Sequence, residues 1–300
     1  MQISMVGLGK MGLNLAENML DNGFKVAGFD IDHNTRKKAS EQGIDTFNSI
    51  ENLVKNMDQG SIVWVMLPAG KITDNSIKNL SKLLHENDIL IDGGNSAYKD
   101  SIRHNELLKK RGVIYFDVGT SGGTNGARNC GNFMIGGDNK KAFSKIEPIF
   151  EKISTKNGYL YTGKTGSGHY LKMIHNGIEY GMMEAIAEGF DVLEHSRFDY
   201  DNEAVARVWS NGSVIRGWLM ELAQLAFSKD NDLENIKGIM HSSGEGKWTV
   251  DEALELKVPT PVITTSLMMR YRSMENDTFT GKVVAALRNE FGGHPIDKIE

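Results

Sequence analysis

Five polar side chains fall along one face of a predicted helix in the middle of the chain. Measured from Lys172, His175 lies at i+3, Asn176 at i+4, Glu179 at i+7 and Tyr180 at i+8. At about 100° per residue, these positions share one side of a helix. Together they supply a base, an acid and hydrogen-bonding groups, the side chains that proton transfer requires. The pattern indicates a helix that lines a cleft.

A solvated helix face with an ordinary Lys–Glu pair is the alternative interpretation of this pattern. Gly177 and Gly181 argue against it, because each glycine costs about 1 kcal/mol relative to alanine in a helix interior. Such losses favour close packing of another chain segment. We therefore expect another segment to pack against this helix at its glycines.

Composition is that of an ordinary globular chain of 300 residues, with 40% apolar and 24% charged residues. A net charge of -5 gives no support to nucleic acid as a partner. Cys130 is the single cysteine, which excludes an internal disulfide and a multi-cysteine zinc site and fits a reducing compartment. The sequence shows no signal peptide and no apolar run of membrane-spanning length, so we expect a cytoplasmic protein that binds no membrane.

The first 30 residues follow the order of a dinucleotide-binding unit. A strand over 2–6 runs into a glycine turn, a helix follows, and a second strand over 25–29 ends at Asp30. Glycines at such a turn permit a tight bend, close approach of a pyrophosphate and close helix–strand packing. The helix N-terminus offers free N–H groups to the phosphates. We predict cofactor contacts from Gly7, Leu8, Gly9, Lys10, Met11 and Gly12.

Asp30 predicts which cofactor is used. A carboxylate at the end of the second strand accepts hydrogen bonds from the adenosine ribose hydroxyls and repels a 2′-phosphate. The sequence therefore favours NAD over NADP. Arg36, Lys37 and Lys38 lie close in sequence and can serve a 2′-phosphate, so the alternative stays open.

Strand and helix patterns alternate through the first half of the chain, which predicts a parallel sheet with helices on both faces. Further strands are expected at 61–66, 89–91 and 113–116, with helices near 74–84, 99–110 and 139–152. Ligands bind outside the carboxyl ends of such strands. The loops there make Met66, Leu67, Asn95, Ser121, Gly122 and Gly123 candidate ligand positions.

Beyond residue 165 the strand signals stop and helical periodicity dominates. Helices are expected over 170–195, 201–210, 214–228, 247–256, 261–273 and 277–289. We therefore predict an α/β Rossmann-type domain over 1–165, followed by an all-α domain over 166–300.

An acidic chain needs a local cluster of cations to hold an anionic ligand. Arg216, Lys247 and Arg288 lie in glycine-bracketed or helix-end contexts, and His294 follows two glycines. Each basic residue taken singly is typical of a solvated surface. Taken together, they can form a phosphate site.

These motifs resemble 6-phosphogluconate dehydrogenase (decarboxylating) over nearly the whole chain. The resemblance rests on segments 7–14, 91–96, 121–123, 166–172, 175–180, 246–249 and 291–294. Its most specific part is the run from Lys172 to Tyr180. It implies the oxidative decarboxylation of 6-phospho-D-gluconate to D-ribulose 5-phosphate and CO2, as in the pentose phosphate pathway and gluconate utilisation, without a metal.

The resemblance also implies a role for each matched residue. Lys172 matches the general base that takes the C3-hydroxyl proton, and Glu179 matches the general acid that protonates C1 of the enediol after CO2 leaves. Positions around the nicotinamide and the sugar-acid carboxylate match Asn95, Ser121, Gly122, Gly123, His175 and Asn176. Contacts at the phosphate end match Tyr180, Arg216, Lys247, Thr249 and Arg288, with His294 at the sugar.

Two departures from better-known members bear on cofactor and assembly. Those members carry Asn-Arg-Thr for NADP after the second strand, where this chain has Asp30-Ile-Asp32. They also carry a second copy of the helical domain, for which 300 residues leave no room. The resemblance therefore implies a short, NAD-preferring form with a helical domain for substrate binding and dimerisation. We expect a homodimer or homotetramer that exchanges its C-terminal tails.

Two other functions are compatible with much of the pattern. A β-hydroxyacid dehydrogenase acting on a small unphosphorylated acid shares the fold, the Ser121-Gly-Gly loop and Lys172, but needs neither a C1 proton donor nor a phosphate site. A non-catalytic NAD-sensing protein is expected to lack Lys172 or Glu179, and both are present.

Overall fold

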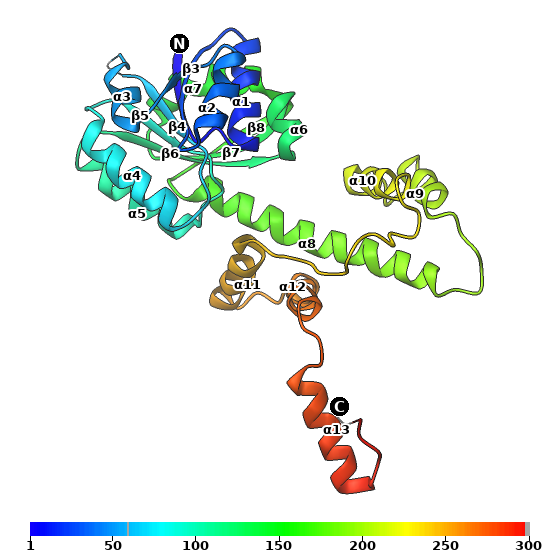
Figure 1. The fold of residues 1–300 in the computed structure, drawn as a ribbon. Coiled ribbons are helices and arrows are strands. Elements are labelled where there is room, and N and C mark those ends of the chain that lie inside the picture. The colour runs from blue at the N-terminus through cyan, green and yellow to red at the C-terminus, as the bar shows by residue number, and fades with distance from the viewer. Residues whose placement is uncertain (59, 298–300) are drawn as a thin grey trace. The chain divides into compact units, whose positions relative to one another are not determined.

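The computed structural model describes residues 1–58 and 60–297, and the chain divides into two compact units, Met1–Asn176 and Gly177–Glu300. The first unit is a sheet with helices on both faces, and the described part of the second is helical (Figure 1). The predicted fold class is thereby confirmed. The domain division into 1–165 and 166–300 stays a prediction, and residues 298–300 lie outside the described residues.

The sheet of the first unit has eight strands in the order β3-β2-β1-β4-β5-β6-β7-β8. All neighbouring strands are parallel except β6 and β7. These two are joined through the short helix α6 (Gly123–Arg128), and a short connection is compatible only with an antiparallel pair. The strands are β1 Gln2–Val6, β2 Lys25–Phe29, β3 Asp45–Phe47, β4 Ile62–Val65, β5 Ile89–Asp92, β6 Ile114–Ser121, β7 Gly131–Gly136 and β8 Ser154–Gly163.

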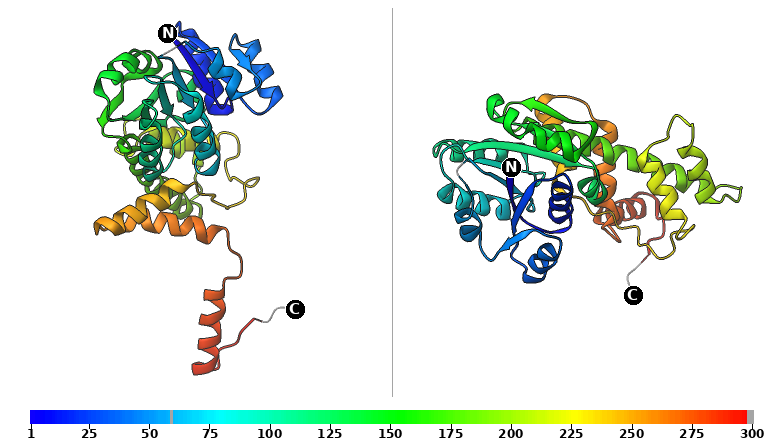
Figure 2. Two further views of the ribbon diagram at one scale, coloured as in Figure 1. Left: turned by 90° about the vertical axis from the view of Figure 1, so that its left-hand side faces the viewer. Right: turned by 90° about the horizontal axis from the view of Figure 1, so that it is seen from above.

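Alternation along the strands builds an apolar core on each face of the sheet. In β4, Ile62 and Trp64 lie in one core, whereas Val63 and Val65 lie in the other, as the two-residue period of a strand requires. Helices cover both faces of the sheet (Figure 2), and these side chains are buried. The helices are α1 Lys10–Asp21, α2 His33–Glu41, α3 Ile50–Lys55, α4 Lys71–Leu83, α5 Tyr98–Lys109 and α7 Lys140–Ile153.

The long helix α8 (Ser167–Glu194) begins in the first unit and ends in the second. The remaining helices are α9 Asn202–Ser210, α10 Trp218–Phe227, α11 Gly244–Leu256, α12 Pro261–Ser273 and α13 Phe279–Gly292. Small apolar clusters form around Tyr180 and around Phe190. Among the described residues, no helix has both the length and the apolar character needed to cross a membrane.

Glycines on α8 mark where other helices of the second unit approach it. A Cβ at Gly177 would lie 2.6 Å from Cγ2 of Thr249 on α11. A Cβ at Gly181 would lie 3.1 Å from Cγ1 of Val262 on α12. The prediction that another segment packs closely against this helix at its glycines is confirmed.

Candidate active site

In the first unit, β6 and the beginning of α8 bring four of the predicted residues together. Lys172 is 5% exposed, and its Nζ donates a hydrogen bond to Oδ1 of Asn176 at 2.6 Å. The same Nζ lies 3.2 Å from Nδ1 of His175. Nε2 of His175 lies 3.1 Å from Oγ of Ser121, at the end of β6. An amine, an amide, an imidazole and a hydroxyl thus form one connected polar chain.

Two more predicted positions border this polar chain. Asn95, in the loop after β5, adopts a left-handed conformation with φ 52°. Its Oδ1 accepts a hydrogen bond from the backbone N–H of Thr120 at 3.0 Å, which ties the β5 loop to the residue before Ser121. Gly122 has φ 101°, a conformation that favours glycine, and turns the chain from β6 into α6. The carboxyl ends of β5 and β6 therefore meet at this position.

The predicted glycine turn joins β1 to α1, and its glycines allow close packing at the start of the helix. A Cβ at Gly12 would lie 2.0 Å from the carbonyl oxygen of Gly7, so the helix begins in close contact with the turn. A Cβ at Gly9 would meet nothing within 4 Å, and α1 has no side-chain cap. Space is therefore open beside Gly9 at the N-terminus of α1, and uncapped helix N-termini are positions where phosphates bind well.

Asp30 is tied directly to this turn. Its Oδ2 accepts a hydrogen bond from the backbone N–H of Leu8 at 2.8 Å, and its Oδ1 accepts one from the backbone N–H of Asp32 at 2.9 Å. Arg36 donates to the backbone carbonyl oxygen of Asp30 at 2.7 Å, so a guanidinium lies at the end of β2. These residues fit a dinucleotide whose ribose lies beside the end of β2.

The loop after β4 also touches the glycine turn. A Cβ at Gly7 would lie 2.4 Å from the carbonyl oxygen of Met66 and 2.9 Å from Cδ2 of Leu67. Any larger residue at position 7 would collide with this loop. Met66 and Leu67 are partly buried and stay predicted cofactor contacts. Lys10 and Met11, in the first turn of α1, also stay predicted cofactor contacts.

In the second unit, three predicted residues lie on α8 and α11, two of them packed and one exposed. Tyr180 is 5% exposed, and a Cβ at Gly246 would lie 2.4 Å from its ring. Thr249 is 2% exposed and donates to the carbonyl oxygen of Glu245 at 2.9 Å. Lys247 is exposed, and its Nζ pairs with Asp251 at 2.5 Å. This ion pair raises the pKa of Lys247 and keeps the amine charged.

Arg270 is a cation that sequence reasoning missed. Its guanidinium carbon lies 3.6 Å from the centroid of the Tyr180 ring, and one of its nitrogens donates to the carbonyl oxygen of His241 at 2.9 Å. A charge over an aromatic face is stabilised by the ring. The sequence carries a weak signal for it, because two arginines flank Tyr271 near the end of α12.

The remaining basic positions lie on exposed segments of the second unit. Arg216 donates to the carbonyl oxygen of Ser213 in its own loop at 3.0 Å. Arg288 is exposed on α13, and the His294 ring lies 6.1 Å from the ring of Phe291. Arg216 and His294 therefore contact their own chain neighbours, and Arg288 lies on an exposed helix. Their substrate contacts stay predictions, as does that of Glu179 on α8.

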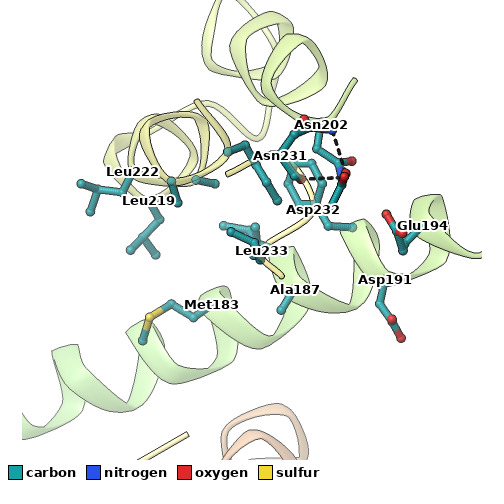
Figure 3. A pocket seen from close by; sticks show the side chains of 15 residues that line it. Met183, Ala187, Asp191, Glu194, Asn202, Leu219, Leu222, Asn231, Asp232 and Leu233 are labelled. Atoms are coloured by element: carbon teal, nitrogen blue, oxygen red, sulfur yellow. Dashed lines mark hydrogen bonds between the residues drawn. The ribbon is translucent and has the colours of Figure 1, made fainter. Parts of the chain in front are cut away.

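A cavity of about 560 Å³ lies elsewhere in the second unit, and its lining includes Met183, Ala187, Leu219 and Leu222 (Figure 3). At one side Nδ2 of Asn202 donates to the carbonyl oxygen of Asn231 at 3.3 Å. None of the predicted site residues lines it. Its largely carbon lining suits apolar contact, whereas the connected polar side chains described above are on β6 and the first part of α8.

Comparison with known proteins matches both halves of the chain. The NAD-binding domain of 6-phosphogluconate dehydrogenase matches residues 2–163, and the C-terminal domain of that enzyme matches residues 168–291. The Bacillus subtilis protein YqeC is 54% identical over 298 residues, which cover 99% of this chain and 100% of YqeC.

Two further relatives extend the match. The NAD(+)-dependent, decarboxylating 6-phosphogluconate dehydrogenase of Haloferax volcanii is 38% identical, with 99% of this chain and 98% of that protein covered. The structure of Plasmodium falciparum 6-phosphogluconate dehydrogenase has a TM-score of 0.82 at 33% identity, and the match covers 100% of this chain and 67% of that one. With its nicotinamide-cofactor domain and its helical domain both matched, the chain belongs to the 6-phosphogluconate dehydrogenase family.

Proposed function

We propose that this protein oxidises and decarboxylates 6-phospho-D-gluconate to D-ribulose 5-phosphate and CO2, with NAD as the preferred cofactor. The observation that carries the proposal is the polar chain Lys172–Asn176–His175–Ser121, built on β6 and α8. A nearly buried amine held by an amide and an imidazole has fixed geometry. Fixed geometry is what a general base requires.

In the proposed reaction Lys172 accepts the proton of the C3 hydroxyl. The bound cofactor supplies the acceptor for the hydride that leaves C3. The protonated amine then stabilises the negative charge that develops on the C3 oxygen as the C1 carboxylate leaves as CO2. Glu179, seven residues further along α8, donates a proton to the former C2 of the substrate, which becomes C1 of D-ribulose 5-phosphate. The charge on the oxygen is met by an ammonium group, so these residues account for the step without a metal.

NAD preference rests on Asp30. Its carboxylate lies beside the glycine turn through the Leu8 N–H, so a 2′-phosphate at this position would meet a negative charge. The guanidinium of Arg36 donates to the backbone carbonyl oxygens of Asp30 and Ile31, which occupies part of its hydrogen-bonding capacity. The NAD(+)-dependence of the Haloferax volcanii relative points in the same direction.

The substrate phosphate is proposed to bind in the second unit. Tyr180, Thr249 and Lys247 are the predicted contacts there, and Arg270 adds a guanidinium directly over the Tyr180 ring. Arginine binds phosphate well because its planar donors match the phosphate oxygens. A small unphosphorylated acid has no use for these cations, which favours the phosphorylated substrate.

Assembly is proposed to involve the C-terminal tail. α13 has no buried residues, and Phe279 is 80%, Phe291 77% and Leu287 58% exposed. Exposed apolar side chains gathered on one helix favour a protein partner. We propose a homodimer or homotetramer in which α13 carries Arg288 and His294 into the site of the partner subunit.

Substrate comparison tests the proposal. Purified protein is incubated with NAD or NADP and with 6-phosphogluconate, gluconate or a small β-hydroxy acid, while NADH and CO2 are recorded. The proposal requires rapid NADH formation with CO2 release from 6-phosphogluconate alone. Turnover of a small β-hydroxy acid without CO2 would support the alternative dehydrogenase, and binding of NAD without turnover of any acid would support the sensing protein.

A further inference from the structure

The buried carboxylate of Asp117, on β6, accepts hydrogen bonds from the first turn of α8. Asp117 is 0% exposed. Its Oδ1 accepts a hydrogen bond from the backbone N–H of Gly166 at 2.6 Å, and its Oδ2 accepts one from the backbone N–H of His169 at 2.8 Å. The first N–H groups of a helix have no partner within the helix. Asp117 therefore caps α8 from a strand 49 to 52 residues earlier in the chain.

Glycines let the helix begin in direct contact with the sheet. A Cβ at Gly168 would lie 2.5 Å from the carbonyl oxygens of both Asp117 and Met134. A Cβ at Gly136 would lie 2.6 Å from Oδ1 of Asp117 and 2.7 Å from the backbone nitrogen of Gly168. No side chain fits between β6, β7 and the start of α8. The hydrogen bonds from Asp117 and this close contact both fix the first turn of α8 against the sheet.

The side chain of His169 adds a link to α5. This residue is 1% exposed, and its Nδ1 lies 2.7 Å from Oγ of Ser101. Burial raises the pKa of the Asp117 carboxyl, while His169 and the two backbone N–H groups oppose the rise and Asp92 adds to it. The turn is thus fixed both to the sheet and to a neighbouring helix.

The base of the proposed reaction lies one turn beyond this anchor. Lys172 follows His169 by three residues, and a Cβ at Gly119 would lie 2.3 Å from Cβ of Lys172. Gly119 and Asp117 are alternate residues of β6 and therefore face the same side of the sheet. The same face of β6 therefore contacts both the start of α8 and the aliphatic part of the Lys172 side chain.

We propose that Asp117 is a positioning residue: its carboxylate fixes the first turn of α8 on β6 and thereby sets where the amine of Lys172 lies. The proposal rests on the proposed function, in which Lys172 is the base. Asp117 acts through the helix and has no role in proton transfer. Replacing Asp117 therefore displaces Lys172. The glycine turn proposed to bind the cofactor is formed by β1 and α1, so it should be unaffected.

Asp88 provides a matched control. It is 2% exposed in the same unit, and its carboxylate accepts backbone hydrogen bonds from Gly60 and His85, each at 2.8 Å. It lies in the loop before β5 and caps no part of α8. Asp88→Asn and Asp117→Asn remove the same charge from comparable pairs of hydrogen bonds. A loss of activity caused only by reduced stability would appear in both variants.

Steady-state kinetics of the two variants test the proposal. We expect kcat with 6-phosphogluconate to fall about 10-fold to 100-fold in Asp117→Asn, because a displacement near 1 Å of a catalytic group costs up to about 100-fold. The Kd for NAD stays within about twofold, and Asp88→Asn keeps kcat within about twofold of wild type, as expected for residues that do not position the base. Equal kcat values in the two variants, measured per folded enzyme, would overturn the proposal.

Amide hydrogen exchange of the wild-type protein tests the anchor without any substrate or variant. The N–H groups of Gly166 and His169 should exchange as slowly as those of β6, whereas those of Lys10 and Met11 on the uncapped helix α1 should exchange quickly. Fast exchange at Gly166 and His169 would overturn the anchor even if the enzyme is active. Slow exchange in a protein that does not oxidise 6-phosphogluconate would retain the anchor and refute the proposed function instead.

Discussion

Gly119→Ala tests whether the position of Lys172 controls the rate. The added Cβ would lie 2.3 Å from Cβ and 2.9 Å from Cγ of Lys172, whereas ordinary contact begins at 3.4 Å. The lysine stem or the strand must therefore move by about 1.1 Å. A displacement of this size is expected to lower kcat about 100-fold, equal to about 2.7 kcal/mol of transition-state stabilisation. Overpacking is also expected to cost about 1–3 kcal/mol of folding free energy.

The assay separates the two effects of Gly119→Ala. The kcat is measured from NADH absorbance at saturating 6-phosphogluconate and corrected for the folded fraction, and the Kd for NAD is measured by fluorescence. Gly189→Ala is the control, because it adds a Cβ to α8 where nothing lies within 4 Å. A Gly119→Ala enzyme with kcat within about threefold of wild type would show that a shift near 1 Å at this lysine does not matter, and would refute the reasoning.

Three further predictions concern the cofactor, the packing and the assembly. Asp30→Asn should narrow the preference for NAD over NADP, measured as kcat/KM, by about 1–3 kcal/mol, because it removes one charged hydrogen-bonding group. Gly177→Ala should lower the free energy of unfolding in urea by about 1–3 kcal/mol through overpacking against α11, whereas Gly189→Ala should raise it by up to about 1 kcal/mol. Mixing Arg288→Ala with Lys172→Ala under conditions that exchange subunits should restore activity, because a hybrid site receives an intact tail beside an intact lysine.

Each of these three predictions can be refuted by a specific result. A wild-type enzyme that prefers NADP would move the cofactor determinant from Asp30 to the neighbouring Arg36. Equal stability of the Gly177→Ala and Gly189→Ala proteins would show that contact with Thr249 is not limiting. Failure to recover activity after proven subunit exchange would place the tail in its own chain's site or outside any site.

Sequence patterns predicted the regular elements well because those patterns are local. The glycine turn and the alternating strands of the first unit follow from short-range periodicity. The strands β3, β7 and β8 were missed: β3 has three residues, β7 contains glycine at both ends, and β8 opens with the polar run Ser-Thr-Lys-Asn-Gly. The antiparallel direction of β7 depends on the short α6 connection, which has no periodic signal of its own.

Side-chain partners between distant elements were harder to predict. The polar face of α8 was visible in the spacing from Lys172 to Tyr180, and the glycines on that helix signalled close packing. Asp117, by contrast, is one acidic residue in an apolar strand, and only the fold places it under the start of α8. Arg270 likewise meets Tyr180 only because α12 packs beside α8. Such partners depend on tertiary contacts between residues far apart in sequence.

The most direct test of the central claim is the fate of C1. Wild-type protein is supplied with NAD and with 6-phosphogluconate carrying ¹³C at C1, and NADH and ¹³CO2 are measured together. The proposed reaction predicts one labelled CO2 for each NADH, and neither product from Lys172→Ala. NADH formed without labelled CO2, or undiminished turnover by Lys172→Ala, would contradict it.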